Sequence, residues 1–152
     1  MPSSNNHTQD LVKLSQWDAL LLESLKGHGW SDDELLRRVR EGDVPEDTSD
    51  FKFNYQNLLD TAAADFATVE AAVRQGYRIK FNTLRGLSNW MRLALSAEPE
   101  VVAEPGQEAI LVTLSPEQHS GLLSAISYGW TVTETGTAAG GSHYRIEPMA
   151  RL

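Results

Sequence analysis

The sequence contains no cysteine, and this absence excludes disulfide bonds, thiolate zinc sites and a cysteine nucleophile. Long apolar runs are also missing, because runs such as residues 19–22 are far shorter than the roughly 20 residues of a membrane-spanning helix. The opening stretch, MPSSNNHTQD, carries no Lys or Arg and so lacks the n-region of a secretory signal. We therefore expect a cytoplasmic protein that has no membrane partner.

Positive charge is scarce in this chain of 152 residues. Thirteen Lys and Arg stand against 21 Asp and Glu, which gives a formal net charge of -8. Such an acidic chain does not coat nucleic acid or anionic membranes through its overall field. Hydrophobic residues make up 41% and charged residues 22%, which is typical of a globular protein with a normal core.

Local catalytic and metal-binding motifs are missing as well. The four histidines, His7, His28, His119 and His143, are not spaced as metal ligands on a helix. No G-x-S-x-G motif of a serine nucleophile occurs either. The glycine-rich stretch 136–142 lacks the Lys-Ser/Thr of a phosphate-binding loop, and the acidic linker 43–50 does not have EF-hand spacing. We predict a non-enzymatic protein without metal or cofactor, although a site assembled from distant residues would leave no such motif.

Helical patterns dominate the first two-thirds of the chain. Residues 1–9 are predicted to be a disordered tail, and residues 10–97 a helical region. Apolar residues at intervals of three and four predict a helix over 10–26, with Trp17 in its buried face. Ser31 and Glu34 form a capping-box pattern for a second helix that ends at Gly42.

Further helices are expected from Asn54 and from Asp65, the latter running to residue 75. The alternation of Tyr77, Ile79 and Phe81 predicts a short strand or an extended turn. Asn82 and Thr83 then supply caps for a helix to about residue 95, and its apolar face includes Trp90.

The last third, residues 98–152, changes character. Residues 104–107 form a turn signal, a β-rich run covers 110–114, and Ser115 to Gln118 form a capping box with Pro at the first helical position. Two further strand patterns follow. We predict an α+β fold in which helices of the N-terminal two-thirds pack with a small C-terminal β-β-α-β-β region, both parts sharing one core because about fifty residues are marginal alone.

Charge is distributed unevenly along the chain. Segment 66–95 contains five basic residues and one acid, Glu70, and its net charge of +4 leaves -12 for the remainder. A local basic region on an acidic body can attract an anionic partner at one place. The candidate binding residues in and beside this region are Arg74, Arg78, Lys80, Thr83, Arg85, Asn89 and Arg92.

The same segment partly resembles a helix-turn-helix unit. In such a unit Lys80 and Thr83 would contact phosphate, while Arg85 and Asn89 would reach base edges from a recognition helix over about 83–95. The turn from Gly76 to Thr83 is, however, longer than the common compact turn of this motif.

Two functions remain open from the sequence. The first is a regulatory or adaptor protein that binds a macromolecule, foremost another protein, through the basic 74–92 surface. The alternative is a DNA-binding transcriptional regulator with the helix-turn-helix-like unit at 66–95. The basic residues also fit the solvated side of core helices, and the sequence does not determine the oligomeric state.

Overall fold

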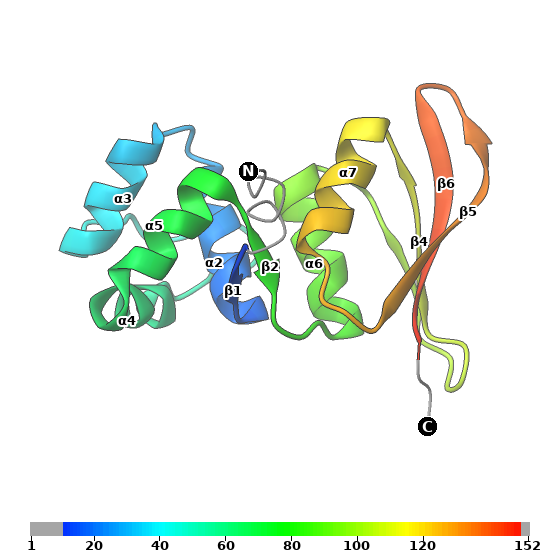
Figure 1. The fold of residues 1–152 in the computed structure, drawn as a ribbon, viewed down its shortest axis with the longest axis horizontal. Coiled ribbons are helices and arrows are strands. Elements are labelled where there is room, and N and C mark those ends of the chain that lie inside the picture. Colours follow the sequence, from blue (N-terminus) through cyan, green and yellow to red (C-terminus); the bar gives the residue numbers. More distant parts are fainter. Residues whose placement is uncertain (1–10, 150–152) are drawn as a thin grey trace, which may run out of the picture. The chain divides into compact units, whose positions relative to one another are not determined.

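The computed structural model describes residues 11–149, and these residues form two compact units that divide after Arg78 (Figure 1). Unit 1 ends at Arg78 and unit 2 begins at Ile79. Helices and antiparallel strands occur together, which confirms the predicted α+β class. None of the helices in the described part of the chain has the length and hydropathy that a bilayer crossing requires. The predicted tail, residues 1–9, lies outside the described residues.

In its described residues unit 1 contains four helices and a two-stranded sheet, whose last residue, Ile79, falls just past the division. In chain order these are β1 (Val12–Leu14), α2 (Gln16–Lys26), α3 (Asp32–Glu41), α4 (Gln56–Ala64), α5 (Phe66–Gln75) and β2 (Tyr77–Ile79). The two strands pair with each other. The predicted order of elements therefore matches only loosely, because short strands interleave with the N-terminal helices.

The first helix begins later than its apolar spacing predicts. Val12–Leu14 form strand β1, and Ser15 starts α2 by accepting a hydrogen bond from the Asp18 N–H at 3.1 Å. The prediction of a helix over 10–26 was wrong at its start. Pairing with β2, more than sixty residues away, satisfies the backbone of β1, and a local pattern cannot anticipate such a partner.

Buried polar contacts connect the helices of unit 1. Asp18 is 4% exposed, and its carboxylate accepts hydrogen bonds from Asn57 Nδ2 and Thr61 Oγ1, both at 2.7 Å. The Tyr77 hydroxyl donates to buried Glu23 at 2.6 Å. These contacts fix α4 and β2 against α2, whose leucines form the apolar centre of the unit.

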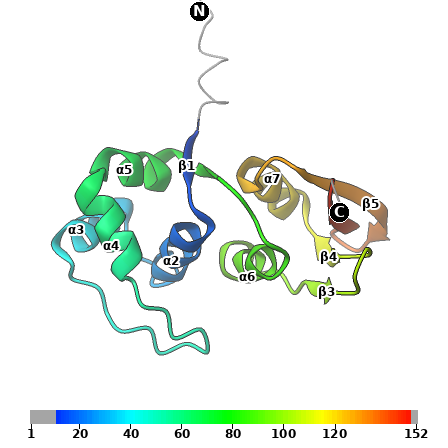
Figure 2. The same ribbon diagram turned by 90° about the horizontal axis from the view of Figure 1, so that it is seen from below.

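As far as residue 149, unit 2 is a four-stranded antiparallel sheet with two helices. Its elements are α6 (Leu84–Leu95), β3 (Glu100–Val102), β4 (Ala109–Leu114), α7 (Pro116–Ala125), β5 (Trp130–Ala138) and β6 (Gly141–Pro148). The strand order is β3-β4-β6-β5, and α6 and α7 pack on one side of the sheet (Figure 2). Fully buried side chains from all layers meet between them; they include Leu87, Met91, Ile110, Leu122 and Ile146.

The division into units falls at residue 78, whereas the change of sequence character falls near residue 98. Helix α6 belongs to unit 2 because it packs against β3, β4 and α7. Helices α5 and α6 thus lie in different units. The helix-turn-helix-like unit at 66–95 and a core shared by residues 10–97 and 98–152 stay predictions.

Candidate interaction surface

Two segments of unit 2 are joined by a reciprocal pair of hydrogen bonds. The Asn82 N–H donates to Ser127 Oγ at 3.1 Å, and the Ser127 N–H donates to Asn82 Oδ1 at 2.8 Å. Asn82 is 1% exposed and Ser127 is 2% exposed. Buried polar groups that satisfy each other hold the backbone in one geometry. The entry to α6 and the exit from α7 are therefore fixed to each other.

Large apolar side chains flank this pair. Phe81, directly before Asn82, is 71% exposed, and Tyr128, directly after Ser127, is 73% exposed. Met149 is a third exposed apolar residue, and its N–H donates to the carbonyl of Gly129, the residue after Tyr128, at 2.7 Å. We call Phe81, Tyr128 and Met149 the apolar patch. Hydrogen bonds of neighbouring residues thus bring the backbones of these three exposed residues close together, and exposed apolar residues near one another are typical of an interaction site.

Basic residues border the apolar patch. Lys80 precedes Phe81 and is exposed, and Arg85 is exposed in the first turn of α6. Neither forms an ion pair with another described residue. Thr83 caps α6, because its Oγ1 accepts the Gly86 N–H at 3.2 Å. The patch and the positive end of α6 thus lie on adjoining residues.

Helix α6 presents its remaining candidate residues on the side opposite its buried face. Leu87, Trp90 and Met91 are buried, whereas Arg92 is exposed and Asn89 is half-buried. Arg92 Nη2 donates to the Pro99 carbonyl at 3.2 Å, so this arginine also anchors the segment after α6. Five of the seven predicted binding residues therefore belong to unit 2, on or just before one helix.

The other two predicted residues belong to unit 1. Arg74 donates to Asp33 Oδ1 at 2.7 Å and to Glu70 Oε2 at 3.3 Å, and the hydrogen bond to Asp33 raises the pKa of its guanidinium above the usual range. Arg78 is half-buried on β2. The structure does not define one surface from 74 to 92, because the division between the units falls inside this range.

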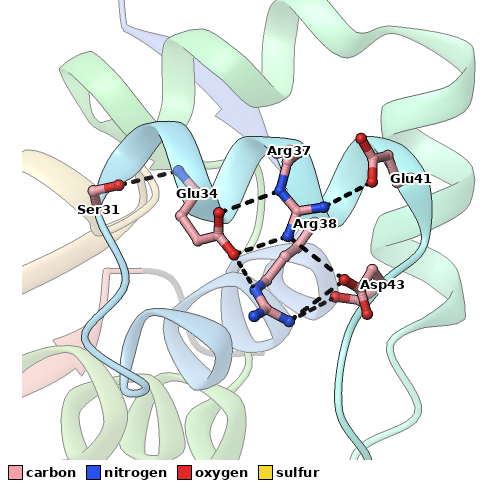
Figure 3. A network of polar contacts seen from close by, with 6 residues as sticks. All are labelled: Ser31, Glu34, Arg37, Arg38, Glu41 and Asp43. Atoms are coloured by element: carbon pink, nitrogen blue, oxygen red, sulfur yellow. Dashed lines mark hydrogen bonds and ion pairs between the residues drawn. The ribbon is translucent and has the colours of Figure 1, made fainter.

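Arginines of α3 are engaged in a network within unit 1 (Figure 3). Arg37 Nη2 and Arg38 Nε both donate to Glu34 Oε2, at 2.8 and 2.7 Å, and Arg37 Nη1 donates to Glu41 at 2.7 Å. The bond from Arg37 lowers the pKa of Glu34 to about 2, and Glu34 in turn raises the pKa of Arg37. The Glu34 carboxylate faces these arginines, while Ser31 accepts the Glu34 N–H as predicted.

Histidines of the described residues lie in ordinary packing positions. His143 Nδ1 shares a hydrogen bond of 2.7 Å with Thr113 Oγ1, and the His119 ring stacks on Tyr144 at 4.4 Å. No group of three or more metal-binding side chains gathers among residues 11–149. The absence of an enzyme activity stays a prediction.

The apolar patch was missed in the sequence. Phe81 continues the alternation of Tyr77 and Ile79, which are buried, but β2 ends at Ile79 and the chain turns before Phe81. Trp17 was predicted to be buried and is 43% exposed, with its ring in edge contact with Phe53, whereas Trp90 is buried as predicted. Period alone does not show where a strand or a core ends.

Comparison with known proteins adds no family. The chain matches no protein-family model and has no significant match among curated proteins or solved structures.

Proposed function

We propose that this protein is a non-enzymatic adaptor or regulator, and that unit 2 binds another protein through the apolar patch and the basic residues beside it. The single observation that supports this proposal is the exposure of Phe81, which directly precedes Asn82, and of Tyr128, which directly follows Ser127 of the buried pair. Anchors held by a rigid backbone lose little conformational entropy on binding. Aromatic anchors also supply most of the binding energy in many protein interfaces.

The charge around the patch indicates the chemistry of the partner. Lys80 and Arg85 are exposed and form no ion pair among the described residues, so an acidic surface would gain favourable contacts there. We expect a partner segment that combines one or two apolar side chains with Asp or Glu. The cytoplasm is the expected compartment.

DNA is the second candidate partner. The observation that favours it is the exposure of Arg85 and Arg92 on one side of α6, with Asn89 between them. A large exposed aromatic pair is not needed for phosphate contacts, which is why a protein partner is preferred.

The test has a capture step and a measurement step. A protein that co-purifies stoichiometrically with the tagged chain is identified, purified and titrated by calorimetry against Phe81→Ser and Tyr128→Ser. We expect each variant to weaken binding about 30-fold, the effect of losing an interface hot spot. Charge reversal at Lys80 and Arg85 should weaken binding further and slow association.

Leu123→Ser is the matched control, because Leu123 is an exposed apolar residue of α7 outside the patch, at 45% exposure. It should retain wild-type affinity. Binding that survives both aromatic substitutions contradicts the proposal. Binding to a random-sequence DNA duplex that falls steeply with salt, and is lost in Arg85→Ala with Asn89→Ala, supports the DNA alternative instead. No retained partner in either assay contradicts both.

A further inference from the structure

Figure 2 shows the loop that joins α3 to α4 in unit 1. This loop lines a second candidate site, independent of the apolar patch. A cavity of about 370 Å³ lies against this loop. Its apolar lining comes from Val44, Phe53 and Leu59, and its polar lining includes Glu46 and Gln56. The cavity is an open depression at the surface, and its lining combines apolar with polar side chains, as the lining of small binding sites does.

A second cavity adjoins the first. It has a volume of about 270 Å³ and shares Glu46 and Phe53 with the larger one, while Asp47 and Lys52 complete its charged lining. The lining of this second cavity therefore carries two carboxylates, of Glu46 and Asp47, and one ammonium group, of Lys52. The Glu46 side chain is exposed and has no hydrogen bond or ion pair with another described residue.

Internal hydrogen bonds hold the loop in shape. Asp47 Oδ1 accepts the Ser49 N–H at 2.9 Å, and Asp47 Oδ2 accepts the Phe53 N–H at 2.8 Å. Partial burial raises the pKa of Asp47, but these N–H groups outweigh it and set the pKa below its ordinary value. The Phe53 ring is further fixed between Phe51, stacked at 5.0 Å, and Trp17, edge-on at 5.4 Å.

A ligand that fits this lining has an aliphatic stem and a cationic end. Lysine and arginine side chains have this form, because they place methylene groups on apolar surface and keep the charged head at a polar rim. We propose that the larger of the two cavities, which is lined by Val44, Glu46, Phe53 and Leu59, holds a lysine or arginine side chain of a bound peptide segment. The stem packs on Val44, Phe53 and Leu59, and the head group donates to the Glu46 carboxylate.

The proposal is tested by NMR titration of the full chain with matched small probes. Nα-acetyl-lysine methylamide carries both stem and ammonium, Nα-acetyl-norleucine methylamide carries the stem alone, and methylammonium carries the charge alone. We expect saturable shifts of the residue 44–59 amides and the Trp17 indole with the lysine probe. The norleucine probe should bind roughly tenfold more weakly, since it lacks the charged hydrogen bond.

Two substitutions distinguish specific binding at Glu46 from nonspecific electrostatic attraction to the acidic loop. Glu46→Gln should remove most of the preference for lysine over norleucine. Asp50 is an exposed acid of the same loop outside both cavity linings, so Asp50→Asn should leave the preference for lysine over norleucine unchanged. Equal binding of the two probes, an equal effect of the two substitutions, or no shift at residues 44–59 would overturn the proposal. Because the site involves unit 1 alone, its failure leaves the patch of unit 2 untouched.

Discussion

Unit 1 connects its helices through side-chain hydrogen bonds and ion pairs, whereas unit 2 connects its strands through backbone pairing. In unit 1 the buried carboxylates of Asp18 and Glu23 accept hydrogen bonds from other elements of the unit. Arg74 of α5 forms an ion pair with Asp33 at the start of α3. In unit 2 the sheet ladder runs through β4, β6 and β5, and Asn82 with Ser127 adds one buried polar pair.

This difference affects which surface groups are available for binding. Arginines of unit 1 such as Arg37 and Arg74 already contact carboxylates within the unit. Lys80 and Arg85 of unit 2 have no such ion pair among the described residues. Arg37 and Arg74 thus have a structural use within their unit, whereas Lys80 and Arg85 are exposed without such a use.

The largest expected effect is on the sheet of unit 2. A side chain added at Gly141 would collide with the Leu114 carbonyl, so Gly141→Ala should destabilise unit 2 by about 2 to 3 kcal/mol. Native-state hydrogen exchange measures this at the amides of β4 and β6. Gly136→Ala on β5 is the control, because its added Cβ would meet only His143, at an ordinary 3.5 Å. Equal loss of protection in unit 1 would show that the units unfold together.

The next effect concerns the polar core of unit 1. Asp18→Ala removes the acceptor for Asn57 and Thr61 and should destabilise unit 1 by about 2 kcal/mol. Hydrogen exchange at the amides of α2 and α4 is the measurement. Asp60→Ala, which removes an exposed acceptor of Gln56, should change stability by less than about 0.5 kcal/mol. Two equal effects would mean that the buried contact adds nothing beyond a surface one.

The smallest effect is the pH dependence of the α3 network. The folded pKa of Glu34, about 2, is below its ordinary 4.5, so its contribution is complete above pH 4.5 and is lost as the pH falls towards 2. The melting temperature of unit 1 should fall more in this window for wild type than for Glu34→Gln. High salt should shrink the difference, because the network is exposed. Identical profiles at low salt would contradict this assignment.

Local hydrogen bonds were predictable from the sequence. Ser31, Asp65 and Thr83 each accept an N–H of the following helical turn, and Ser115 with Gln118 forms the predicted reciprocal capping box. A cap depends on residues three positions apart, so its partner is visible in the sequence. The strand pattern at Tyr77 and Ile79 is likewise confirmed.

Features that depend on distant partners were not predictable. Val12–Leu14 became a strand because β2 lies beside them, and Trp17 is exposed although its spacing matches that of buried leucines. The apolar patch depends on Asn82 and Ser127, which are 45 residues apart. No local pattern encodes such a contact.

The sequence by itself determined the α+β class, the lack of thiol chemistry, the basic character of segment 66–95 and the caps at Ser31, Asp65, Thr83 and Ser115, but not those of α2 and α4, which begin after Ser15 and Tyr55. The tertiary structure decided which charges are used internally and which large side chains stay exposed. The physical reason is range: caps and periodicity involve neighbours within one or two turns. Exposure and ion pairing depend instead on which distant surfaces the fold brings into contact.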